Sequence, residues 1–344
     1  MNLPPCAPLV SVVFPVYNAE RFVAAALESV LSQSFRDFEV IVLNDGSTDR
    51  SLAEVERVAG SDPRVRVVSR PNKGLVETLN EGVALARGPW IARMDHDDVS
   101  MPDRFAIQLR HLEASDTDIC GTAVTYFGEA PELTRSYPLS DQTIKFRLLY
   151  DCALAHPSVM ARASLLKGNP YDVAAVHAED YELWCRLAMK GAVFANIAQP
   201  LLMYRRHREQ VSLKHQDEQR HCADKTALAY LRWYLHRNGL KDLEPLVTRT
   251  WAGRADPQLP SYAALLWQLE ARQDIRDPHI AVHMCASAAV RGIDRAQAID
   301  LYRLILKRGD TRIADRFKLV VSGLLGRSAY AGIKRMHGYI RNGR

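Results

Sequence analysis

The sequence lacks the cysteine patterns that mark several classes of protein. Its six cysteines include no Cys-x-x-Cys pair and no His/Cys cluster at zinc spacing, so neither a disulfide framework nor a zinc site is predicted. No stretch reaches the roughly 18 consecutive apolar residues that a membrane-spanning helix needs. The first ten residues contain three prolines and no apolar run of the kind found in secretory signals. These absences predict a cytoplasmic protein, either soluble or peripheral at the inner face of a membrane.

Two signatures of phosphate binding are also missing. Neither a Gly-x-Gly-x-x-Gly segment nor a Walker A segment follows the first predicted strand, which disfavours a dinucleotide site and a kinase-type phosphate cradle. Aromatic residues are few among the basic residues near the C-terminus. Nucleic acid is therefore not an expected partner.

Charge is divided unevenly along the chain. Residues 221–344 contain 21 lysines and arginines against 11 aspartates and glutamates, whereas residues 1–220 contain 24 against 29. The hydrophobic pattern changes at nearly the same place, because strand-like and helical runs alternate at first and only helical runs follow later. We therefore expect two domains, residues 1–215 and a basic helical domain of residues 216–344.

The N-terminal pattern predicts a Rossmann-like α/β fold. Strands are expected at residues 9–14, 38–43, 65–68 and 90–94, with helices at 19–33, 49–59 and 74–86. This alternation is typical of a mostly parallel sheet with helices on both faces, and ligands of such sheets bind beyond the carboxyl ends of the strands. In the C-terminal extension, helices are expected at residues 217–238, 241–251, 261–273, 279–291, 294–308 and 310–325.

The densest polar motif is the run Asp95-His96-Asp97-Asp98 after the fourth predicted strand. Carboxylates this crowded repel one another unless a cation lies among them, and they favour Mg²⁺ or Mn²⁺ bridging to a substrate phosphate. Taken alone, however, the run is better explained as a solvated acidic turn that caps the next helix.

A second motif, Asp45-Gly-Ser-Thr-Asp49, follows the second predicted strand. Gly46 permits a tight turn close to a ligand, and Asp45 at the strand end is placed to bond a ribose hydroxyl or a base edge. A strand-to-helix turn without any ligand explains the same residues.

Four segments together resemble family 2 glycosyltransferases. These segments are Ser11–Asn18, Asp45–Asp49, Arg70–Gly74 and Asp95–Asp98, in the order and spacing of that family. The resemblance covers roughly residues 8 to 215. It implies a GT-A fold, inverting transfer of a sugar from a nucleotide-sugar donor that is usually UDP-linked, and a divalent metal at an Asp-x-Asp motif.

The resemblance also implies roles for single residues. The nucleotide-sugar-binding residues that it implies are Pro15, Tyr17, Asn18, Asp45, Asn72, Arg93, Asp95, His96, Glu179 and Arg205. The metal ligands that it implies are Asp97, Asp98 and His207. Within the first group, Pro15, Tyr17 and Asp45 would form a uridine pocket. Arg93 would flank the nucleotide or its phosphates, and Arg205 would pair with the diphosphate.

An inverting transfer needs a base that takes the proton of the acceptor hydroxyl. The acidic pair Glu179-Asp180, at the start of an amphipathic run, matches the Glu-Asp of the family, and Asp180 is the candidate base. The pair could instead only favour a helix N-terminus electrostatically. The segment His156–Met160 resembles the family's strand beneath the acceptor pocket.

The basic C-terminal region has three interpretations: an accessory packing domain, a contact in a homo-oligomer, or an interfacial anchor that touches a membrane. The predicted function is transfer of one sugar to a glycan or glycolipid acceptor in bacterial cell-surface polysaccharide synthesis. A sugar-nucleotide pyrophosphorylase would need a Gly-rich basic loop where Phe14–Asn18 stands. A non-catalytic scaffold that binds nucleotide sugar would have no reason to keep both Asp97 and Asp180.

Overall fold

The structure is a computed structural model that describes residues 7–129, 131–207, 216–245, 247 and 259–275. The chain divides into two compact units. The first comprises residues 1–148 and 152–226, and the second comprises residues 149–151 and 227–344. The expected helices beyond residue 275, and with them most of the basic C-terminal region, lie outside the described residues.

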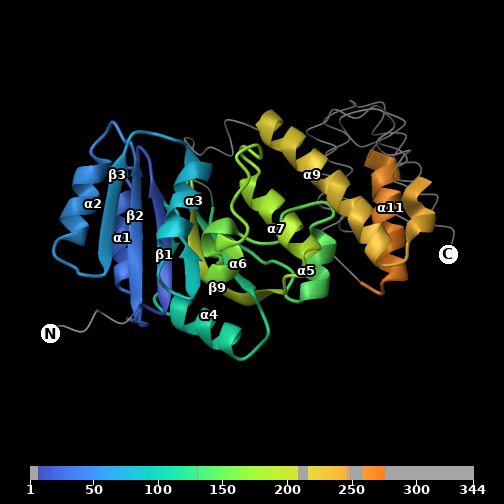
Figure 1. Cartoon of the computed structure of the whole chain (residues 1–344), viewed down its shortest axis with the longest axis horizontal. Helices are drawn as coiled ribbons and strands as arrows, with labels where there is room; N and C mark the ends of the chain where they lie inside the picture. The colour runs from blue at the N-terminus through green and yellow to red at the C-terminus, as the bar shows by residue number, and fades with distance from the viewer. Residues whose placement is uncertain (1–6, 130, 208–215, 246, 248–258, 276–344) are drawn as a thin grey trace. The chain divides into compact units, whose positions relative to one another are not determined.

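The N-terminal unit alternates strands and helices, as Figure 1 shows. Its strands are β1 (Val10–Val16), β2 (Phe38–Asp45), β3 (Val65–Arg70), β4 (Trp90–Arg93), β5 (Val99–Ser100), β6 (Ile119–Gly128), β7 (Leu133–Arg135), β8 (Met160–Arg162) and β9 (Phe194–Arg206). Its helices are α1 (Val23–Leu31), α2 (Ser51–Ala59), α3 (Leu75–Leu85), α4 (Arg104–Glu113), α5 (Asp141–Arg147), α6 (Ala163–Lys167) and α7 (Glu179–Met189), with a 3₁₀ turn η1 (His156–Ser158).

The strands form one mixed sheet in the order β3-β2-β1-β4-β8-β6-β9-β5, and β7 pairs with β6. The four strands that the sequence predicts are parallel neighbours, with β1 between β2 and β4 and with β3 outside β2. Beyond β4 the sheet is mixed, because β8 runs antiparallel to both β4 and β6 while β9 runs parallel to β6. The predicted α/β fold is confirmed.

Helices cover both faces of the parallel half of this sheet. Val12 and Phe14 of β1 belong to the same buried cluster as Leu27 of α1. Val13, which points to the opposite face because side chains alternate along a strand, lies beneath Gly82 of α3. A Cβ on Gly82 would lie only 2.5 Å from the Val13 side chain, so the glycine allows α3 to approach the sheet closely.

The 22-residue α9 (Gln216–Arg237) begins in the first unit and ends in the second. In the second unit, η2 (Lys241–Leu243) and α11 (Leu259–Arg272) follow it. Among the described residues of this unit, α9 and α11 bury aromatic and aliphatic side chains, including Tyr230, Leu231, Ala263 and Leu266. Within the described residues, no helix is both long and apolar enough to cross a membrane.

Candidate functional site

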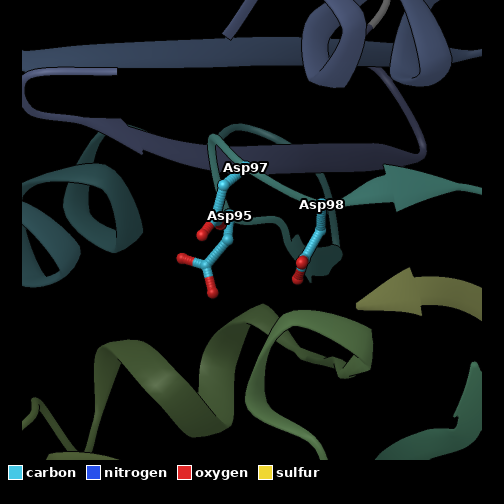
Figure 2. A group of neighbouring side chains, drawn as sticks. All are labelled: Asp95, Asp97 and Asp98. Carbon is cyan, nitrogen blue, oxygen red and sulfur yellow. The ribbon is translucent and has the colours of Figure 1, made fainter. Parts of the chain in front are cut away.

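Three aspartates leave one loop between β4 and β5, at the carboxyl end of β4. Carboxylate oxygens of Asp95, Asp97 and Asp98 lie within 4.8 Å of one another, and Figure 2 shows the three side chains on the same side of the loop. Asp98 is almost fully buried, and its Oδ2 has no hydrogen-bond partner among the described residues. Burial, followed by the charges of Asp97 and Asp95, raises the pKa of Asp98 well above its ordinary value. Crowding of this kind is what a bound cation would relieve.

The end of β9 holds this loop in place. The backbone N–H of Arg205 donates to Asp98 Oδ1 at 2.8 Å, and its Nε donates to the carbonyl of Asp97 at 2.7 Å. The same guanidinium lies over the rings of Phe22 and Phe127, at 4.6 and 4.3 Å from their centroids. Arg205 therefore supports the aspartate loop, a contact that the sequence did not suggest for a residue expected at the diphosphate.

His207 follows β9 and lies beside the cluster. Its Nε2 is 2.9 Å from Asp97 Oδ2, and its Nδ1 is buried without a partner among the described residues. Carboxylate oxygens with one imidazole nitrogen form a donor set that suits Mg²⁺ or, better, Mn²⁺. The unpaired Asp98 Oδ2 and the close spacing of the carboxylates fit such an ion.

The carboxyl ends of β1 and β2 form the adjoining part of the same rim. Asn18 has a positive φ of 48°, its N–H donates to Ser47 Oγ, and its Oδ1 accepts from the N–H of Thr48. The next N–H groups donate to side chains around the start of α2: Ala19 to Ser51 Oγ at 2.6 Å and Glu20 to Asp49 Oδ2 at 3.0 Å. The helix α1 begins at Val23, four residues after the expected start at residue 19.

Asp45 is nearly buried at the end of β2. Its carboxylate pairs with Arg70 and accepts the backbone N–H groups of Lys73 and Gly74 at 2.8 and 3.0 Å. The Asn72 amide donates to the Asp45 carbonyl at 2.9 Å. This network orients Asp45 rigidly beside the rim, where it was expected to meet the base or ribose.

Pro15 and Tyr17, which were also expected in the nucleotide pocket, lie at and just after the end of β1. His96 Nδ1 lies 3.3 Å from the carbonyl oxygen of Pro15, which joins the aspartate loop to β1. Tyr17 is 46% exposed, an unusual position for a large aromatic side chain. An exposed ring just after the end of β1 provides a surface on which a nucleobase could stack.

Glu179 and Asp180 begin α7, as the amphipathic pattern predicts. Burial is the largest cause that raises both carboxyl pKa values, and the charge of Asp180 helps to raise the pKa of Glu179 to about 7. The Sγ of Cys152 lies 3.8 Å from Asp180 Oδ2. An acidic pair with raised pKa values is suited to take up a proton near neutral pH.

Arg93, the last residue of β4, connects the two acidic groups. It is 6% exposed and forms an ion pair with Asp95. Its positive charge also lowers the pKa values of Glu179 and Asp180. Arg93 thus lies within electrostatic reach of both the aspartate loop and α7. Its expected place beside the nucleotide or its phosphates stays a prediction.

Tyr171, which precedes α7, was not among the residues expected at the site. Asn80 of α3 bonds both the N–H and the carbonyl of Tyr171, at 2.8 and 3.0 Å. The Tyr171 hydroxyl lies 2.8 Å from Nε2 of His156, and burial of that histidine lowers its pKa. His156 lies on the turn η1 and not on the expected strand, which begins only at Met160. The Pro157 that follows His156 was the available signal for a turn.

Comparison with known proteins agrees with this geometry. Residues 11–167 match the sequence model of glycosyl transferase family 2. An uncharacterized glycosyltransferase of Haemophilus influenzae is 28% identical over 249 residues, which cover 68% of this chain and 76% of that protein. The O-antigen biosynthesis glycosyltransferase WbnJ of Escherichia coli is 27% identical, over 64% of this chain and 84% of that protein. The chain covers less than a third of the length of several other curated relatives.

Two solved structures have the same fold. S. aureus TarS 1-349 in complex with UDP-GlcNAc aligns with a TM-score of 0.53 at 18% identity, over 82% of this chain and 91% of that one. The mannosyltransferase PcManGT of Pyrobaculum calidifontis, in complex with GDP-Man and Mn²⁺, aligns with a TM-score of 0.50 at 17% identity, over 88% and 86% of the two chains.

Proposed function

Since this chain belongs to glycosyltransferase family 2, we propose that it transfers a sugar with inversion from a nucleotide sugar to a hydroxyl group of an acceptor. The observation that carries the proposal is the arrangement of two acidic groups around Arg93. Asp95, Asp97 and Asp98 lie at the carboxyl end of β4, and Glu179-Asp180 begins the helix α7. One group suits a departing diphosphate, and the other suits an attacking hydroxyl.

On the donor side, Asp97 and Asp98, with His207, would hold Mg²⁺ or Mn²⁺, and Asp95 would contact ribose or the donor sugar. The cation would supply positive charge that stabilises the departing diphosphate. Asp45, fixed by Arg70, would accept an N–H of the base or a ribose hydroxyl, and the exposed ring of Tyr17 would stack on the base.

On the acceptor side, Asp180 would take the proton of the attacking hydroxyl. The acceptor oxygen then bonds to the anomeric carbon as the bond from that carbon to the phosphate oxygen breaks, and its electron pair leaves with the nucleoside diphosphate. Attack from the face opposite the leaving group inverts the configuration. Arg93 would keep Asp180 ionised at neutral pH, because its charge favours the carboxylate.

The donor is proposed to be UDP-linked, and the acceptor to be a glycan or glycolipid of a bacterial cell surface, at the inner face of the membrane. The E. coli relative named for O-antigen biosynthesis and the UDP-GlcNAc complex of TarS support these assignments. The GDP-Man complex of PcManGT makes a guanosine donor the first alternative to test.

The proposal is tested with a panel of UDP, dTDP and GDP sugars, each with Mn²⁺, Mg²⁺ or EDTA. We expect one donor to raise the thermal midpoint and to be hydrolysed slowly without acceptor, only when a divalent cation is present. Asp97→Ala should weaken cation-dependent donor binding, whereas Asp180→Asn should keep donor binding and lose turnover. No turnover of any donor, with donor binding unchanged in Asp97→Ala, would overturn the proposal.

The same panel separates the other functions. A non-catalytic scaffold would bind a nucleotide sugar and turn over none, with Asp180→Asn indistinguishable from the wild type. A pyrophosphorylase would release inorganic pyrophosphate from a nucleoside triphosphate and a sugar phosphate. The segment after β1 provides no basic glycine-rich loop for that chemistry.

A further inference from the structure

Arg104, the first residue of α4, is a fully buried arginine. Within the described residues, no carboxylate forms an ion pair with it, and burial lowers its pKa to about 9. A buried guanidinium charge is costly unless its N–H groups form hydrogen bonds. The contacts of Arg104 therefore indicate what its side chain is for.

The guanidinium bonds the backbone where the aspartate loop begins. One Nη donates to the carbonyl of Arg93 at 2.7 Å and lies 3.4 Å from the carbonyl of Val159, while the other lies 3.5 Å from Sδ of Met94. Arg93 is the last residue of β4, and its carbonyl belongs to the peptide bond with Met94, the residue directly before Asp95. Fixing that peptide fixes the direction in which the loop leaves the sheet.

Gln108, one turn later on α4, orients the guanidinium. Its Oε1 accepts from Nε of Arg104 at 3.0 Å, and its Nε2 donates to the carbonyls of Cys120 and Ser158, both at 2.9 Å. These carbonyls belong to β6 and to the turn η1. The two side chains of α4 thus connect the end of β4 to β6 and to the turn η1.

The opposite end of the loop is held separately by Arg205, through Asp97 and Asp98. Arg104 therefore fixes the start of the loop, and Arg205 fixes its end. A divalent cation requires its oxygen ligands within a few tenths of an ångström of ideal positions. By fixing the two ends of the loop, Arg104 and Arg205 therefore affect the distances between the carboxylates and so the affinity for the cation.

We propose that Arg104 is a positioning residue of the aspartate cluster, because its planar guanidinium sets the peptide from which the loop starts. The inference rests on the proposed use of a divalent cation by Asp97 and Asp98. Lysine would keep the charge but lose the fork that reaches Gln108 and the Arg93 carbonyl together.

The test is Mn²⁺ binding by the full chain, measured by electron paramagnetic resonance of free Mn²⁺ at 15 °C, alongside thermal midpoints. Arg104→Lys is compared with Arg147→Lys, since Arg147 is another buried arginine, at the end of α5. We expect Mn²⁺ to bind about 10-fold or more weakly to Arg104→Lys. Binding by Arg147→Lys should stay within about twofold of the wild type, even if both variants melt earlier. Uridine diphosphate binding in EDTA should change in neither variant.

Equal Mn²⁺ affinity in folded Arg104→Lys and wild type would overturn the inference, and so would an equal loss in both variants. If Arg104→Lys does not fold, Gln108→Leu keeps the arginine and removes its orienting oxygen. Unchanged Mn²⁺ affinity in that variant would likewise overturn the inference. A wild-type protein that binds no Mn²⁺ would instead contradict the proposed cation use on which the inference rests.

Discussion

The imidazole Nε2 of His207 lies 2.9 Å from Oδ2 of Asp97, which joins the end of β9 to the aspartate loop across 110 positions of sequence. Both side chains are largely buried, at 11% and 14% exposure. An imidazole that touches a candidate metal ligand either becomes a ligand itself or orients that carboxylate. Either role makes cation binding depend on this histidine.

His207→Ala is therefore expected to weaken Mn²⁺ binding about 10-fold or more, as is usual when a ligand or its orienting partner is lost. The measurement is a Mn²⁺ titration followed by electron paramagnetic resonance. The matched control is His236→Ala in the C-terminal unit, where the histidine is half-exposed and pairs loosely with Glu244. Equal affinities in the two variants would show that His207 has no part in the cation site.

Some elements of the fold could be predicted from the sequence, and others could not. The strands β1 to β4 were predictable because β-branched runs alternate with helical periodicity. The position of Asp45 and the aspartate cluster on one rim followed from the rule that parallel strands end at the same edge. That β8 lies between β4 and β6 could not be predicted, because antiparallel pairing across about 70 residues leaves no local pattern.

The residues of the candidate site were likewise only partly predictable from the sequence. The sequence pattern places polar residues next to strand ends, but it does not reveal the partners that orient them. Arg205 was expected at the diphosphate, which stays a prediction; its bond to the Asp97 carbonyl and its contacts with two aromatic rings were not foreseen. Arg104 and Tyr171 were not singled out, since contacts such as those of Arg104 with Val159 and of Tyr171 with Asn80 join positions 55 and 91 residues apart.

The acidic pair predicts the pH dependence of turnover. Burial raises the pKa of Asp180, and Arg93 opposes that rise. Because the base must be ionised, kcat/KM should fall as the pH falls through the apparent pKa of the pair, which lies above the ordinary carboxyl values. Glu179→Gln removes a like charge and should move this acid limb to lower pH. Arg93→Met should move it to higher pH, so shifts in the same direction for both variants would contradict the assignment.

Glu179 should also reduce the stability of the protein near neutral pH. Its pKa is raised from 4.5 to about 7, so the folded chain binds this proton more tightly than the unfolded chain does. Stability is therefore lost as the pH rises through that window, and the full loss is present above it. Glu179→Gln should raise the thermal midpoint at pH 8 by several degrees and leave it unchanged at pH 4.

The control for that experiment is Glu182→Gln on the same helix. Glu182 pairs with Arg186 at 2.8 Å, so its replacement should lower the midpoint at pH 8 and not raise it. If Glu179→Gln were also destabilising at pH 8, burial of this carboxyl would not carry the cost that its raised pKa implies.

The turn after β2 provides a test of the nucleoside side that is independent of metal. Gly46 has φ +68°, and a Cβ there would lie 2.6 Å from the backbone nitrogen of Asn72. Gly46→Ala should therefore displace the segment that fixes the Asp45 carboxylate and weaken binding of uridine diphosphate in EDTA about 10-fold. Gly191→Ala is matched in backbone strain, with φ +90°, but its Cβ would meet nothing within 4 Å.

Both variants should lose about 1 kcal/mol of stability or more from the left-handed conformation, measured by urea unfolding. Only Gly46→Ala should lose nucleotide affinity, measured by calorimetry, because only there does the new methyl group push against the backbone that orients Asp45. Equal nucleotide affinity in the two variants would remove Asp45 and its turn from the donor site.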